Sequence, residues 1–146
     1  MVERDYLMRI LQEFFDAIAR IIHRGKSDQE PDLAEMENRF SDMYRQFFKK
    51  PAEYFYEAEK ETLLNDLEQE GYPEEHLFAK IQMLSELLYQ DALIKKCIPE
   101  KCMMLEKVFY LLACLNQNSR TFSWERNQRM EDIRKKLEEF DIRDER

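Results

Sequence analysis

The sequence predicts an all-α fold, and three observations carry this prediction. The 146 residues contain two glycines and four prolines. Nearly all of them lie between segments in which apolar residues recur every three or four positions, the period of a helix with one buried face. No segment alternates apolar and polar residues for long enough to form a strand. We therefore expect about six sequential, antiparallel helices with short connections, arranged as a bundle or a tetratricopeptide-like helical stack.

Length and composition favour one folded domain, which we assign to residues 1–146. The chain is 44% hydrophobic and 37% charged, so it has enough apolar side chains for a core. We expect an N-terminal helix over residues 1–24, helical hairpins over 32–140 and a charged, frayed tail over 141–146. The formal net charge of −8 disfavours nucleic acid as a partner, because its phosphates attract basic surfaces.

The first predicted helix carries apolar residues around most of its circumference. These residues are Tyr6, Leu7, Ile10, Leu11, Phe14, Phe15, Ala17, Ile18, Ile21 and Ile22. A helix with so wide an apolar arc needs neighbours on two sides. It is therefore either the central helix of the bundle or a helix that completes its burial against another chain. Phe14 and Ile18 lie on this arc, and in the second case they are candidate partner-binding residues.

The second and third helices are predicted on either side of Pro51. The buried face of the second is expected to hold Leu33, Met36, Phe40, Met43 and Phe47. Pro51 suits the first turn of the third helix, and Gly71 suits its C-terminal cap. The inner face of this third helix is expected to hold Phe55, Ala58, Thr62, Leu63 and Leu67, opposite a strongly acidic outer face.

Three more helices are predicted in the remainder of the chain. The fourth follows Pro73, the fifth follows Pro99, and the last runs from about Phe122 to Phe140. Their inward positions are Leu77, Ile81, Leu84, Leu88 and Ala92, then Leu105, Val108, Phe109, Leu112 and Leu115, then Met130, Ile133, Leu137 and Phe140. The lengths and the joint of the fourth and fifth helices fit one tetratricopeptide-like hairpin.

The ionisable residues form no recognised catalytic or metal-binding pattern. His23 and His76 are the two histidines, and they lie in different joints. Cys97 and Cys102 make one close-spaced pair, whereas a structural zinc site normally takes two such pairs. The sequence contains neither a glycine-rich phosphate loop nor a Gly-x-Ser-x-Gly elbow. We therefore expect no catalytic residue, no metal and no cofactor.

Two aromatic groups are predicted to contact a protein partner. Tyr54 and Tyr56 flank Phe55 in the third helix, so at least one of their rings is expected to be exposed. Phe122 and Trp124 lie where the last helix begins. Exposed aromatic side chains are frequent hot spots of protein interfaces. One hypothesis is head-to-tail self-association between the basic residues near Trp124 and the acidic face of the third helix.

The sequence favours a cytoplasmic location. Glu3, Arg4 and Asp5 interrupt what would be the apolar segment of a secretory signal. No uncharged run approaches the roughly 18 residues that a transmembrane helix requires. The three cysteines are an odd number, and we expect them to be buried free thiols in a reducing compartment.

The opening Arg4-Asp5-Tyr6-Leu7-Met8-Arg9-Ile10, its apolar continuation and the helical pairs that follow resemble an uncharacterised family of small, all-helical bacterial proteins. Proteins of this kind begin with an aromatic-Leu/Ile-Met/Leu-Arg helix and continue as tetratricopeptide-like hairpins. The resemblance covers most of the chain, and Tyr-Leu-Met-Arg is its most specific motif. It implies a bacterial cytoplasmic helical protein and brings no assigned activity, catalytic residue or cofactor.

These observations predict a non-catalytic scaffold or adaptor that binds a protein partner, or a second copy of itself, through helical faces. One alternative is an enzyme or small-ligand-binding domain with a pocket between hairpins, which would need a buried polar group. The other is attachment to a membrane surface through the first helix. The mixture of acidic and basic residues on that helix disfavours the membrane alternative, since surface-seeking helices favour a basic polar face.

Overall fold

The computed structural model describes residues 2–25 and 32–144, which confirm the predicted all-α class. The helices are α1 (Val2–Gly25), α2 (Leu33–Phe48), α3 (Ala52–Glu57), α4 (Lys60–Gln69), α5 (Glu74–Leu93), α6 (Ile98–Asn118) and α7 (Trp124–Asp144). The described residues therefore hold seven helices and no strand, against about six helices predicted.

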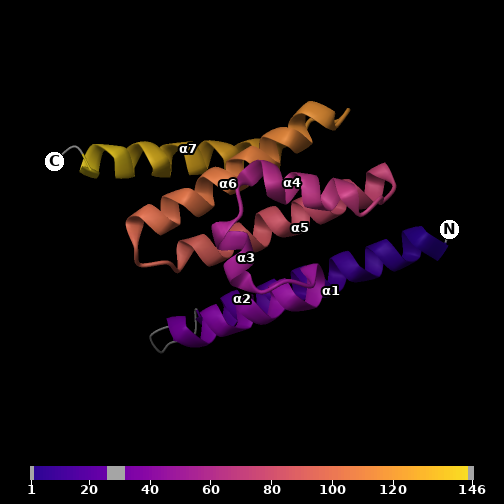
Figure 1. Cartoon of the computed structure of the whole chain (residues 1–146), viewed down its shortest axis with the longest axis horizontal. Coiled ribbons are helices and arrows are strands. Elements are labelled where there is room, and N and C mark those ends of the chain that lie inside the picture. The colour runs from indigo at the N-terminus through magenta and orange to yellow at the C-terminus, as the bar shows by residue number, and fades with distance from the viewer. Residues whose placement is uncertain (1, 26–31, 145–146) are drawn as a thin grey trace.

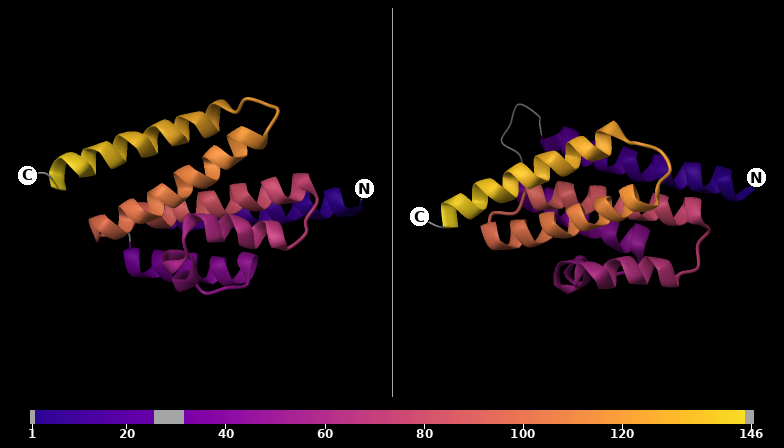
Figure 2. Two further views of the ribbon diagram at one scale, coloured as in Figure 1. Left: turned by 45° about the horizontal axis from the view of Figure 1, so that its top comes forward. Right: turned by 90° about the horizontal axis from the view of Figure 1, so that it is seen from above.

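Helix α5 occupies the centre of the arrangement. It contacts α1 and α2 on one side and α6 on the other, and α4 lies against both α5 and α6 (Figure 1). Helix α7 packs on α6 and forms the outermost layer (Figure 2). Consecutive helices of similar length thus lie side by side, as short connections require.

Helix α1 is part of the core of this chain. Leu7, Phe14, Ile18 and Ile21 are buried, with Phe14 at 0% exposure and Ile18 at 4%. The apolar arc of α1 finds its two neighbours in α2 and α5, as the width of that arc predicted. The central position belongs to α5 instead.

The prediction of one helix between Pro51 and Gly71 is wrong, because this segment forms two helices, α3 and α4. Ala58 and Glu59 separate α3 from α4 and have extended backbone, with ψ of 142° and 152°. The break rotates α4 about its axis relative to a continuous helix. Thr62 is therefore exposed, although it was predicted to face inward. No glycine or proline marks this break in the sequence.

A lysine from a distant helix stabilises the break. In a continuous helix, the carbonyl oxygens of Phe55 and Tyr56 would accept hydrogen bonds from the residues four positions later. Instead, Lys107 of α6 donates to both, with Nζ 3.0 Å from the Phe55 oxygen and 2.5 Å from the Tyr56 oxygen. Lys107 is 6% exposed, and burial lowers the pKa of its amine. The donor that satisfies the carbonyl groups at the break therefore lies some fifty residues further along the chain, beyond the reach of local sequence patterns.

We expect a Lys107→Met variant to lose about 1–3 kcal/mol of unfolding free energy, because methionine fills similar space but leaves two buried carbonyl groups unpaired. Urea denaturation monitored by circular dichroism measures this loss. Lys135→Met is the matched control, since Lys135 is exposed on α7. Equal stability of the two variants would contradict the capping role of Lys107.

A buried lysine also bonds to a carbonyl group at the end of α2. The carbonyl of Phe47 would accept a hydrogen bond from residue 51, but Pro51 has no N–H. Lys80 of α5 supplies the missing donor, with Nζ 3.0 Å from the Phe47 oxygen. Lys49 adopts the left-handed conformation, with φ of 63°, and its backbone N–H bonds to Arg45.

The remaining boundaries differ little from the predictions. Helix α7 begins at Trp124 and continues to Asp144, four residues beyond the predicted end at Phe140. No glycine or proline interrupts that segment, so the helix extends into the predicted charged tail. Residues 145–146 lie outside the described part of the chain.

Candidate functional site

Contrary to the expectation from the sequence, neither Tyr54 nor Tyr56 projects into solvent. Both rings are half-buried, so the expectation that at least one is exposed is wrong. The Tyr54 hydroxyl donates to Asp66, and its ring lies 4.1 Å from the ammonium of Lys50. Because α3 is short and sits between α2 and the start of α4, groups from several segments cover its opposite faces.

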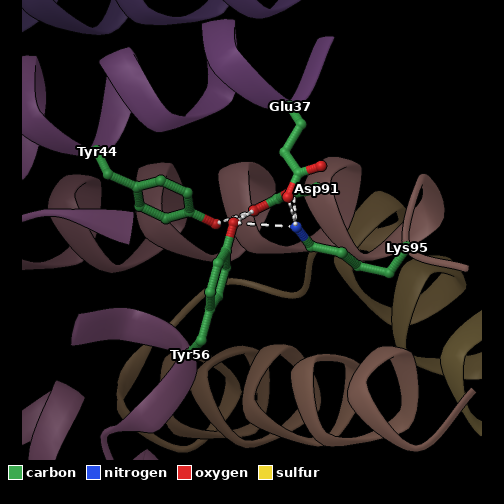
Figure 3. A network of polar contacts seen from close by, with 5 residues as sticks. All are labelled: Glu37, Tyr44, Tyr56, Asp91 and Lys95. Atoms are coloured by element: carbon green, nitrogen blue, oxygen red, sulfur yellow. Dashed lines mark hydrogen bonds and ion pairs between the residues drawn. The ribbon is translucent and has the colours of Figure 1, made fainter. Parts of the chain in front are cut away.

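Tyr56 belongs to a buried polar network that joins α2, α3 and α5 (Figure 3). Its hydroxyl donates to Asp91 Oδ2 at 2.5 Å, and the Tyr44 hydroxyl donates to the same oxygen at 2.9 Å. Lys95 Nζ lies 3.4 Å from Asp91 Oδ1 and donates to Glu37 Oε1 at 2.9 Å. Asp91 is 0% exposed, so a carboxylate sits inside the apolar core with a cation and two hydroxyl donors around it.

Burial and the contacts within this network shift the pKa values of its members. Burial raises the pKa of Asp91, and hydrogen bonds from Tyr56, Lys95 and Tyr44 oppose that rise. Burial and the neighbouring Asp91 raise the pKa of Tyr44 and Tyr56, which keeps both hydroxyls protonated as donors. Burial opposes the charge of Lys95, but Glu37 and Asp91 together raise the pKa of its amine above the ordinary value of a lysine.

An enzyme or a small-ligand-binding domain would need a buried polar group, and this network supplies one. The network is nevertheless not arranged as an active site. Asp91 and Tyr44 are both at 0% exposure, so a substrate cannot reach them in the folded chain. The two hydroxyls, the Lys95 amine and the Asp91 carboxylate are directed at one another rather than at a space, and one Glu37 oxygen closes the network at its exposed edge (Figure 3). A signal for it existed in the sequence: Asp91 follows Leu88 by three residues on the inner stripe of α5, four residues before Lys95.

Phe122 and Trp124 are exposed as predicted, at 79% and 67%. They lie where the chain turns from α6 into α7, and Arg120 beside them is exposed as well. We call Arg120, Phe122 and Trp124 the aromatic tip.

Hydrogen bonds hold the base of the aromatic tip in place. Asn116 of α6 donates to Asn127 of α7 at 3.1 Å and accepts from the Arg126 guanidinium at 2.9 Å. The backbone N–H of Arg126 donates to the Ser123 hydroxyl at 3.2 Å, which caps α7. The aromatic side chains therefore project from a joint that is fixed on both sides.

A cavity of about 280 Å³ lies beside the tip and is lined by residues of α1, α5, α6 and α7 and by Ser123 of the joint. Its lining residues are Phe15, Gln82, Ser85, Glu86, Val108, Leu112, Ser123, Glu125, Arg126 and Arg129. Arg129 pairs with Glu86 at 2.6 Å and lies 3.8 Å from the centre of the Tyr89 ring. Of the three basic residues near Trp124, namely Arg120, Arg126 and Arg129, two thus have partners within the chain: Asn116 for Arg126 and Glu86 for Arg129.

A second depression, of about 190 Å³, occurs at the break between α3 and α4. Its lining residues are Glu57, Ala58, Glu59, Lys60, Met103, Glu106 and Lys107, and we call this depression the α3–α4 hollow. The three glutamates are exposed, and Met103 is 55% exposed. The hollow exists because the chain turns between the two short helices.

The cysteines and histidines do not form a site in the described part of the chain. Cys97, Cys102 and Cys114 are free thiols, but Cys97 is exposed and the other two are half-buried, so the expected full burial is wrong. His23 is exposed, and His76 stacks on the Tyr72 ring at 4.1 Å. Residues 2–25 and 32–144 contain no group of three or more His, Cys, Asp or Glu side chains able to hold a metal ion.

Comparison with known proteins adds no family to this description. No family model, curated protein or solved structure matches the chain. Among the described helices, none has both the length and the apolar character needed to cross a bilayer.

Proposed function

We propose that this chain is a non-catalytic protein-binding module and that the aromatic tip is its partner surface. The observation that carries the proposal is the exposure of Phe122 and Trp124, at 79% and 67%, on a joint held by hydrogen bonds. Tryptophan is among the residues most enriched at interface hot spots. A preformed joint lowers the entropy cost of binding, because its backbone need not be ordered.

Two features favour protein binding over the alternatives. The cavity beside the tip has its charged lining residues engaged with each other, since Arg129 pairs with Glu86, so a small ligand would have to compete with that ion pair. Attachment to a membrane through α1 would need Phe14 and Ile18 at the surface, and both are buried. The α5–α6 pair would act as one tetratricopeptide-like hairpin that supports the tip.

We also propose a bacterial, cytoplasmic setting for this module. Three free thiols suit a reducing compartment. The bacterial assignment rests on the resemblance of the N-terminal motif, Tyr-Leu-Met-Arg at residues 6–9.

Photo-cross-linking tests the proposal directly. A photoreactive phenylalanine analogue is incorporated at position 122 while the chain is expressed in the cells that naturally make it. On irradiation, it is expected to give a discrete covalent adduct with a protein. The same analogue at Arg134, on the exposed face of α7, is the control for non-specific reaction. Adduct formation at position 122 that does not exceed the level at position 134 would refute binding through the tip.

A further inference from the structure

We propose that the aromatic tip binds the α3–α4 hollow of a second copy of this chain, in a head-to-tail arrangement. This inference rests on the proposed function, and it identifies the partner of the same surface. Each copy presents one tip and one hollow, so the two complementary surfaces are present wherever the chain is.

The chemistry of the two surfaces is complementary. The tip offers two aromatic rings and the exposed cation of Arg120. The hollow offers Met103 and three exposed carboxylates, which outnumber the two lysines of its lining, Lys60 and the buried Lys107. Methionine sulfur makes favourable contacts with aromatic rings, typically at a ring edge. A guanidinium pairs with carboxylates through charge-assisted hydrogen bonds. The proposed contact therefore combines an apolar centre with a charged rim, as specific interfaces commonly do.

The arrangement within one chain makes this contact intermolecular. Met103 lies in the first half of α6, and the tip follows the last turn of the same helix. At a rise of about 1.5 Å per residue, the hollow and the base of the tip lie roughly 24 Å apart along the helix axis. The tip cannot fold back into the hollow of its own copy, because the straight helix α6 separates them (Figure 2).

A head-to-tail contact has a predictable consequence for assembly. The tip and the hollow are different patches, so the interface is heterologous and each bound copy leaves one free tip and one free hollow. Such contacts produce a ring when the rotation between copies closes and an open chain of copies when it does not. Oligomer size should therefore increase with protein concentration unless a ring closes.

Sedimentation velocity on a tip variant, a hollow variant and their mixture tests this proposal. The tip variant is Phe122→Ser with Trp124→Ser, and the hollow variant is Glu57→Lys with Met103→Asp; all four positions are exposed. Wild-type chain is expected to self-associate with rising concentration, and each variant is expected to do so about tenfold or more weakly. The equimolar mixture is expected to form a one-to-one dimer and nothing larger, because one intact tip meets one intact hollow.

Glu68→Lys is the matched control, since Glu68 is exposed on α4 but does not line the hollow; it is expected to associate as the wild type does. Circular dichroism confirms that each variant is folded. A mixture that stays monomeric while the wild type associates would overturn the proposal, as would a wild type that stays monomeric.

In the cross-linking experiment, an adduct of twice the monomer mass supports the second copy as partner. An adduct with a different protein, together with a monomeric wild type, overturns this inference and leaves the proposed function intact.

Discussion

An Asp91→Ala variant is expected to lose about 3–5 kcal/mol of unfolding free energy, because removing one partner leaves the other buried polar groups without compensation. Lys95 and the hydroxyls of Tyr44 and Tyr56 all lie within hydrogen-bond or ion-pair reach of this carboxylate. Asp91 itself is 0% exposed, so these groups are paired with the carboxylate away from bulk water. Urea denaturation measures the loss.

Two further variants make this result specific. Asp42→Ala removes an exposed carboxylate from α2, and we expect it to change stability by no more than about 0.5 kcal/mol. Asp91→Asn keeps the shape and one acceptor oxygen, so we expect an intermediate loss. If Asp91→Ala is as stable as Asp42→Ala, the network does not contribute to stability as we describe.

The second large effect is expected at Phe14, where substitution by alanine should lower the unfolding free energy by about 3–5 kcal/mol. The Phe14 ring packs edge-on against Phe15, Phe47 and Phe48, with ring centroids 5.2, 5.1 and 6.4 Å away. Alanine would leave a cavity among these rings and remove the edge-on contacts that the Phe14 ring makes with them. The loss is large beside the roughly 5–15 kcal/mol that stabilises a typical domain.

Tyr6→Ala is the control for Phe14→Ala, because Tyr6 lies on the same helix but is 50% exposed. Thermal unfolding followed by circular dichroism compares the two. A Phe14→Ala variant with the same unfolding temperature as the wild type would show that α1 is not needed for the core. The partner-binding role that the sequence suggested for Phe14 and Ile18 would then regain support.

The buried network also explains why α3 can be so short. A six-residue helix is unstable by itself, since helix formation has a costly nucleus. Here Tyr56 anchors α3 to Asp91 of α5, and Lys107 of α6 caps its end. The same anchoring positions the α3–α4 hollow relative to α6, which links the stability of the core to the geometry of the proposed interface.

The sequence by itself determined the helices that its local pattern encodes. Prolines and a glycine between periodic segments predicted α2, α5 and α6 closely, and the spacing of Leu84, Leu88 and Ala92 predicted which face of α5 is buried. The exposure of Phe122 and Trp124 was also predictable, because both lie at a polar joint outside the apolar stripe. Such features depend on residues within a few turns of each other.

The tertiary structure alone decided the break at Ala58 and Glu59, the burial of Asp91 and the roles of Lys80 and Lys107. A lysine or an aspartate reads as a surface residue in a local pattern, because its charge is costly to bury alone. It becomes an interior residue when the fold brings a matching carbonyl, hydroxyl or opposite charge to it. The carbonyl and hydroxyl partners lie 33 to 52 residues away in the chain, beyond any local pattern, whereas the Asp91–Lys95 spacing of four is the one part of this arrangement that the sequence displays.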